Sequence, residues 1–163
     1  PLLRNEILDA EAVKSNSVHV YLLSGGFLKR IVGLANKEND RQFRVFLHES
    51  TDKTELPTNM EVFRLSGTEF TESIRNSGTV ICTAGFETLA EAIFLDKPLV
   101  VIPSKGHFEQ YCNSLDAVRA GAVYEMEWDG NPEFQVSLHN PAHEQFIEWH
   151  SKGEEIILKC LTE

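Results

Sequence analysis

The stretch that decides the fold spans residues 78–121 and reads GTVICTAGFETLAEAIFLDKPLVVIPSKGHFEQYCNSLDAVRAG. It contains two short apolar runs rich in β-branched residues, Thr79–Thr83 and Leu99–Ile102, and such runs are typical of buried strands. Each run is followed by a turn that contains a glycine and then by a segment with helical periodicity. This repeated unit predicts a parallel α/β sheet with an anion-binding edge at the carboxyl ends of its strands.

The remaining chain continues the alternation of strands and helices. Further strands are predicted at Val18–Leu23, Phe43–Leu47, Glu61–Leu65 and Ala122–Met126. Further helices are predicted at Leu28–Asn36, Glu69–Asn76 and Ala142–Leu161, the last one interrupted near Gly153, and residues 127–138 are predicted to be a loop. The fold class is therefore α/β, with a doubly wound, mostly parallel, six-stranded and Rossmann-like sheet.

The helix that begins near Gly85 carries a candidate ligand. On an ideal helix Leu89, Ala92 and Ile93 share one apolar face, whereas Glu87 and Glu91 point away from it. We therefore expect the Glu91 carboxylate to be free to bind a ligand.

A spaced series of glycine, proline and polar residues runs through the same stretch: Gly85, Thr88, Glu91, Pro103, Glu109, Gln110, Asn113 and Gly121. In order and spacing this series resembles the nucleotide-sugar-binding half of GT-B glycosyltransferases, especially the branch of the bacterial lipid II N-acetylglucosaminyltransferase. The plant and mammalian UDP-glucosyl and glucuronosyl transferases share a looser version. The resemblance covers about Val80 to Val123 and extends more weakly upstream to His19.

The resemblance implies a site for a nucleoside diphosphate sugar, with UDP as the expected nucleotide. Glu91 would accept hydrogen bonds from both ribose hydroxyls. Thr88 and the backbone N–H groups that follow Gly85, beginning with Phe86, would meet the phosphates at a helix N-terminus. The uracil base would lie against backbone groups in the loop after the third strand, at Leu65 and Ser66.

Other positions would bind the sugar and the diphosphate. Gln110, with Glu109 beside it, would bind hydroxyls of the donor sugar, and Asn113 would bond backbone or ligand one helical turn later. His107 would contact phosphate or sugar, with simple helix capping or exposure as the alternative. In the family, a first glycine turn lies against the diphosphate, and here that turn contains Gly25 and Gly26.

Two departures from the family pattern bear on the ligand. Thr83 stands where the glucosyl and glucuronosyl transferases have a histidine, two positions before the glycine turn. Ala84 stands where the lipid II branch has a serine. The frame of Gly85, Thr88 and Glu91 remains, so donor binding is expected. The pattern does not identify the base or the sugar of the donor.

The resemblance implies metal-independent glycosyl transfer to an acceptor hydroxyl, without a cofactor and with a role in cell-envelope polysaccharide. In this family the general base belongs to an N-terminal, acceptor-binding domain, so no catalytic residue is assigned here. Residues 1–17, which contain the proline-led segment PLLRNEIL, are interpreted as an interdomain linker, and residues 18–163 as the donor-binding domain. The alternative is that Pro1 follows a removed start or tag.

Two other functions compete with this hypothesis. A nonhydrolysing sugar-nucleotide epimerase shares the fold, but it carries a second glycine and paired glutamates that AGFETLAE lacks. A stand-alone nucleotide-sugar-binding subunit of a two-chain transferase would be expected to begin with methionine directly before the first strand, and the PLLR segment speaks against it.

Composition limits the other classes of function. The 163 residues suit one domain with a full core, and 42% of them are hydrophobic. A formal charge of −10 argues against a nucleic-acid or anionic-lipid surface, so backbone N–H groups, with a cation such as Lys105, are expected to hold a diphosphate. The absence of a long apolar run and of a signal peptide predicts a soluble, cytoplasmic protein, whose full-length form could lie at the membrane periphery.

Cysteine and histidine positions give no evidence for a metal. Cys82, Cys112 and Cys160 lie far apart without a CxxC pair, which predicts reduced, buried thiols. His139 and His143 have helical spacing, but Asn140-Pro141 between them indicates a helix start that leaves His139 outside the helix. No metal site is therefore expected.

Overall fold

A computed structural model describes residues 3–11, 13, 15–48, 55–124 and 143–162. Along the chain these residues form α1 (Asn5–Leu8), β1 (Ser17–Leu22), the 3₁₀ turn η1 (Gly25–Phe27), α2 (Leu28–Lys37), β2 (Gln42–Leu47), β3 (Met60–Arg64) and α3 (Gly67–Asn76). They continue with β4 (Thr79–Cys82), α4 (Phe86–Phe94), β5 (Leu99–Val101), α5 (Phe108–Arg119), β6 (Val123–Tyr124), α6 (His143–Ser151) and α7 (Gly153–Thr162).

The strands form one parallel sheet in the order β3-β2-β1-β4-β5-β6. The chain starts in the middle, moves outward to β3, and then crosses back to β4 beside β1, so the predicted doubly wound order is confirmed. Five strands have three residues or more, whereas β6 is a two-residue edge strand. The last two residues of the predicted final strand and the predicted loop at 127–138 lie outside the described residues.

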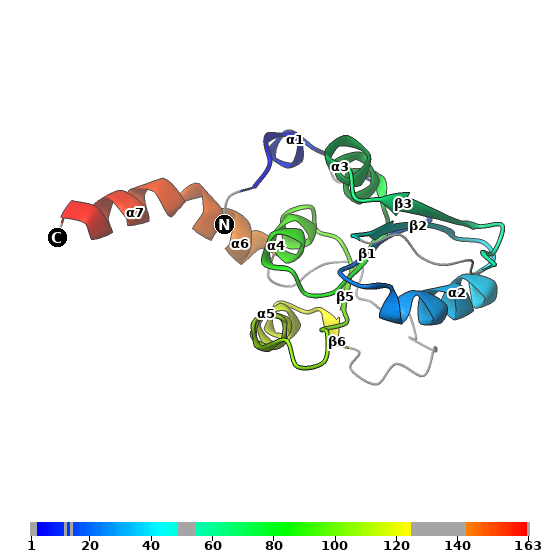
Figure 1. Cartoon of the computed structure of the whole chain (residues 1–163). Coiled ribbons are helices and arrows are strands. Elements are labelled where there is room, and N and C mark those ends of the chain that lie inside the picture. The colour runs from blue at the N-terminus through cyan, green and yellow to red at the C-terminus, as the bar shows by residue number, and fades with distance from the viewer. Residues whose placement is uncertain (1–2, 12, 14, 49–54, 125–142, 163) are drawn as a thin grey trace.

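Helices cover both faces of this sheet (Figure 1). The face under α2 buries a cluster that joins the helix residues Leu28, Ile31 and Leu34 to Val20 and Val45 of the central strands. The other face is covered by α3 and α4, whose Ile74 and Leu89 belong to a second buried cluster. The central strand β4 is buried at every position because both faces are covered, which explains its uninterrupted apolar sequence.

The lead-in segment packs against the second face. Ile7 of α1 is fully buried in the cluster under α3 and α4. The Nζ atom of Lys97, which follows α4, donates hydrogen bonds to the carbonyl oxygens of Val13, Arg75 and Ser77 at 2.8, 2.9 and 2.7 Å. These contacts fix part of the predicted linker on the domain, while the boundary at residue 17 stays a prediction.

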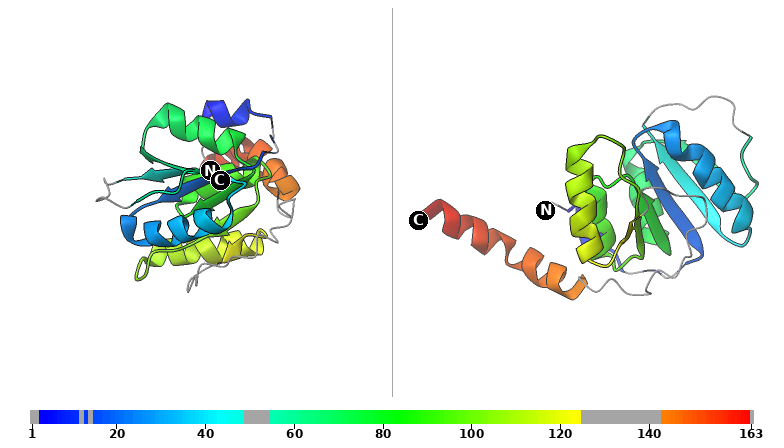
Figure 2. Two further views of the ribbon diagram at one scale, coloured as in Figure 1. Left: turned by 90° about the vertical axis from the view of Figure 1, so that its right-hand side faces the viewer. Right: turned by 90° about the horizontal axis from the view of Figure 1, so that it is seen from below.

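The C-terminal helical region divides at the predicted place. Helix α6 ends at Ser151 and α7 begins at Gly153, so the predicted interruption near Gly153 is confirmed. Helix α6 packs against α4, and His143 Nδ1 lies 2.9 Å from the carbonyl oxygen of Ile93. Helix α7 projects away from the sheet in Figure 1 and in the right-hand view of Figure 2.

The three cysteines are free thiols with different exposure. Cys82 in β4 is buried, and burial raises the pKa of its thiol to about 12. Cys160 in α7 is exposed, so the prediction of three buried thiols is wrong for this residue. The reason is that α7 leaves the core, and a helical pattern cannot reveal whether a partner covers the helix.

Candidate functional site

Parallel strands bring the loops after β1, β3, β4 and β5 to one edge of the sheet. This edge includes the point between β1 and β4 where the chain reverses its direction of winding, which is the usual ligand position in doubly wound sheets. A cavity of about 390 Å³ lies there. It is lined by residues from the lead-in, β1, the β3–α3 loop, α3 and α4: Arg4, Tyr21, Leu65, Ser66, Gly67, Phe70, Glu87, Thr88 and Glu91.

Four residues predicted to bind the nucleotide meet in this cavity. Leu65 and Ser66 follow β3, and Thr88 and Glu91 lie on α4. The two pairs are more than twenty residues apart in the chain, and the β3-to-β4 crossover brings them together. We call this cavity the ribose-end cavity, after the position that the sequence analysis predicted for the ribose.

The Glu91 carboxylate is paired within the protein. Arg4 Nε donates to Glu91 Oε1 at 2.6 Å, Arg4 Nη2 donates to Oε2, and Arg4 Nη1 donates to Thr71 Oγ1 at 2.8 Å. The guanidinium also lies over the Phe70 ring, 5.0 Å from its centroid. The hydrogen bond to Glu91 raises the pKa of Arg4 above its usual value, so the cation is retained at any working pH.

The prediction that Glu91 is free on an outward-facing flank is therefore wrong. The Glu91 side chain is 3% exposed, compared with 37% for Arg4. The helix pattern correctly separated Glu91 from the apolar stripe of Leu89 and Ala92, but it could not show that α3 and the lead-in cover this second flank. Sequence reasoning also missed Arg4, because an arginine 87 positions away carries no local signal for this pairing.

The N-terminus of α4 is open toward the same edge. No side chain caps this helix, whose N-cap is Gly85. Gly85 has an ordinary φ of −69°, and a Cβ placed on it would meet no atom within 4 Å. Neither the backbone conformation nor the packing of the free protein thus requires glycine there, which fits a position that a ligand approaches closely.

The preceding residue adopts an unusual conformation. Ala84 has φ of +56°, in the left-handed region that non-glycine residues seldom adopt. Asn113 Nδ2 donates to the Ala84 carbonyl oxygen at 3.1 Å and so ties α5 to this turn. Asn113 therefore makes the backbone bond that was one of its two predicted roles.

The residues predicted to bind the sugar separate into buried and exposed groups. Gln110 is buried, and its Oε1 accepts a hydrogen bond from the Ser104 N–H at 2.8 Å, which orders the β5–α5 loop. Glu109 is exposed on α5, and His107 is exposed at the N-cap position without a capping bond from its side chain. These neighbours point differently because α5 buries only one side.

A second cavity, of about 670 Å³, lies at the carboxyl ends of β1 and β5. His107 and the loop residues Ser104 to Gly106 line it, together with Phe27 and Arg30 from the β1 side. Gly25 and Gly26 immediately precede Phe27 in the turn η1 and are exposed. Arg30 and Lys105 place two cations on this cavity, although the chain as a whole has a net charge of −10.

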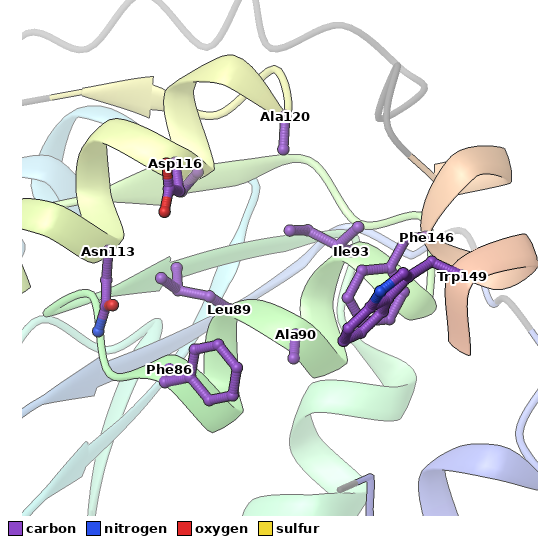
Figure 3. Close-up of a pocket in the computed structure, with 10 residues that line it drawn as sticks. Phe86, Leu89, Ala90, Ile93, Asn113, Asp116, Ala120, Phe146 and Trp149 are labelled. Atoms are coloured by element: carbon purple, nitrogen blue, oxygen red, sulfur yellow. The ribbon is translucent and has the colours of Figure 1, made fainter. Parts of the chain in front are cut away.

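Phe86 and Asn113 contribute to a third, mainly apolar pocket of about 280 Å³ between α4, α5 and α6. Figure 3 shows the rings of Phe146 and Trp149 side by side at one end of this pocket and Phe86 at the other. The side chain of Phe86 therefore faces this pocket rather than the ribose-end cavity. Its predicted phosphate contact concerned the backbone N–H, and that assignment stays a prediction.

Neither a metal-binding cluster nor a membrane-spanning helix occurs among the described residues. No group of three or more His, Cys, Asp or Glu side chains among them is arranged to hold a metal ion. No helix in the described ranges is long and apolar enough to cross a membrane. His139 of the rejected histidine pair lies outside these ranges.

Solved structures show which class of fold this is. The crystal structure of the glycosyltransferase SnogD from Streptomyces nogalater is similar, with a TM-score of 0.61 and 17% identity over 93% of this chain and 43% of that one. Spinosyn rhamnosyltransferase SpnG matches with a TM-score of 0.58 and 19% identity over 88% of this chain and 38% of that one. SpnG complexed with thymidine diphosphate gives a TM-score of 0.50 and 18% identity over 93% of this chain and 40% of that one. The chain thus has an α/β fold of the GT-B glycosyltransferase kind.

Sequence comparison identifies the family. The model of glycosyl transferase family 1 matches residues 1–133, and the chain belongs to this family. An uncharacterized glycosyltransferase of Methanosarcina mazei is 26% identical over the whole chain, and one of Methanosarcina acetivorans is 25% identical. The chain spans 39% of the length of each relative. The particular branch of the lipid II enzyme is not confirmed by these matches.

Proposed function

We propose that this chain is the donor-binding part of a metal-independent glycosyltransferase that moves a sugar from a nucleoside diphosphate sugar, with UDP as the preferred nucleotide, to an acceptor hydroxyl. The observation that carries the proposal is the ribose-end cavity, where Leu65, Ser66, Thr88 and Glu91 meet at the switch point of the sheet. The family match supports glycosyl transfer as the reaction.

The chemistry follows from the environment of the leaving group. As the bond between the anomeric carbon and the diphosphate breaks, negative charge grows on the nucleoside diphosphate. The uncapped N-terminus of α4, with the open approach at Gly85 and with Thr88 in the first turn, would stabilise this charge through backbone N–H groups and the helix dipole. Arg30 and Lys105 on the second cavity add positive charge at the proposed sugar and diphosphate end.

The acceptor and its general base belong, in this proposal, to another domain of the same polypeptide. The relatives are more than twice as long as the part that matches this chain, and this difference leaves room for such a domain. A separate acceptor chain is the competing arrangement. In both cases the isolated chain is expected to bind a donor but to turn it over slowly or not at all.

Calorimetry with nucleotides tests the proposal. UDP and UDP-N-acetylglucosamine should bind more tightly than ADP, and binding should survive EDTA. Thymidine diphosphate is a necessary comparison because a neighbour of similar fold was solved with it. Tighter binding of thymidine diphosphate than of UDP would mean that the preferred nucleotide carries thymine rather than uracil. Equal binding of every nucleotide, or binding of none, would refute the proposed function.

A further inference from the structure

The guanidinium of Arg4 occupies both oxygens of the Glu91 carboxylate, which is the group proposed to bind the ribose. Its Nε and Nη2 atoms donate one hydrogen bond each, to Oε1 and Oε2. A ribose would present two hydroxyl donors, from its 2′ and 3′ positions, to the same pair of oxygens. In its donor pattern Arg4 is therefore an internal substitute for the ribose.

Arg4 also limits access to that carboxylate. The Glu91 side chain is almost completely covered, whereas more than a third of the Arg4 side chain is exposed in the wall of the ribose-end cavity. Contacts with Thr71 and Phe70 hold the guanidinium from the α3 side. Burial of Ile7, three residues later, anchors the backbone nearby, so only the side chain has to move to open the site.

We propose that Arg4 is an autoinhibitory latch on the ribose subsite, which closes on Glu91 in the free protein and is displaced when a nucleotide binds. The inference rests on the proposed function of this cavity. A latch of this kind lowers the apparent affinity by the fraction of molecules in which it is open, and it does so equally for every ligand that needs Glu91. A ligand that does not use Glu91 is not affected.

Calorimetry with Arg4→Gln tests the latch. The glutamine side chain loses the charged fork, so UDP and 2′-deoxy-UDP should both bind about 10-fold more tightly, with the ratio between them unchanged. Inorganic pyrophosphate should bind the variant no more tightly than the parent. Tighter UDP binding would be informative because removal of a positive charge near an anionic ligand should by itself weaken binding.

Two further variants separate the latch from other effects. Arg4→Lys keeps the charge but loses the bidentate geometry, so its UDP affinity should lie between those of the parent and Arg4→Gln. Arg119→Ala removes an exposed arginine that pairs only locally with Asp116, and it should leave UDP affinity unchanged. Thermal unfolding of each variant verifies that the protein is folded, and Arg4→Lys decides the question if Arg4→Gln does not fold.

A direct readout comes from the Arg4 side chain. In the ¹⁵N-labelled parent, the Nε–H resonance should report the Glu91 bond in the free protein and should shift when UDP, but not pyrophosphate, is added. UDP affinity that is unchanged or reduced in Arg4→Gln and Arg4→Lys would overturn the latch. Unchanged affinity would mean that Arg4 has no role in binding, and reduced affinity would mean that Arg4 itself binds the nucleotide. If the parent protein binds no nucleotide, the proposed function is refuted, and with it the latch that rests on it.

Discussion

Removing either partner of the Arg4–Glu91 pair should destabilise the protein by different amounts. Arg4→Ala leaves a carboxylate that is 3% exposed without its two donors, whereas Glu91→Ala leaves a guanidinium that is 37% exposed and still bonded to Thr71. Loss of one member of a fully buried pair costs about 3–5 kcal/mol. The adjoining cavity admits water to this site, so we expect about 3 kcal/mol for Arg4→Ala and about 1 kcal/mol for Glu91→Ala.

The double variant makes this reasoning quantitative. Once Glu91 is absent, no buried charge remains to be compensated, so the double variant should be more stable than Arg4→Ala alone, by about 1 kcal/mol or more. Urea unfolding of the four proteins measures these free energies, with the slope of each transition verifying two-state behaviour. Equal losses for the two single variants, or strictly additive losses, would refute the argument from asymmetric burial.

Three other predictions concern separate sites. Gly85→Ala should leave the midpoint of thermal unfolding within about 1 °C of the parent value, because the added Cβ meets no atom within 4 Å. Calorimetry should nevertheless show weaker UDP binding. A lower midpoint would mean that the fold itself needs this glycine. Burial lowers the pKa of His19 to about 3, so as the pH falls below 6.5 the unfolded chain takes up a proton on this histidine before the folded protein does. Urea unfolding should therefore show a loss of stability of about 1.4 kcal/mol per pH unit toward pH 4, and His19→Leu should lack this loss. An equal pH dependence in both proteins would contradict a neutral, buried His19. Thiol labelling at pH 8 should modify Cys160 first and Cys82 only on unfolding, because burial raises the pKa of Cys82 to about 12; early labelling of Cys82 would contradict its burial.

Local pattern was sufficient for the strands, for helices α2 to α7 and for their layering, but it did not predict the short helix α1 in the lead-in segment. Uninterrupted apolar runs such as Thr79–Cys82 predict strands covered on both sides, and parallel strands joined by helices allow few arrangements. The order β3-β2-β1-β4-β5-β6 follows from these constraints together with the family signature. Gly153 similarly predicted the break before α7.

The candidate site was predictable only in part. The spacing of Gly85, Thr88 and Glu91 placed these residues on one turn and one helix, and the parallel topology implied that Leu65 and Ser66 lie nearby. The state of each side chain depends on groups from distant segments. The pairing of Glu91 with Arg4, like the buried bond between Gln110 and the Ser104 backbone, is therefore absent from any local pattern.

The sequence by itself determined the α/β class and the positions of most strands and helices, because hydrophobic periodicity and turn chemistry act over a few residues. The spacing of its motifs also indicated a glycosyltransferase. Only the tertiary structure decided which polar groups are covered. Coverage depends on how α1, α3 and α4 pack together, and this packing closes Glu91 beneath Arg4 while leaving the α4 N-terminus open. The same helix thus carries a buried, paired carboxylate and an accessible anion-binding end, a difference that its own periodicity cannot express.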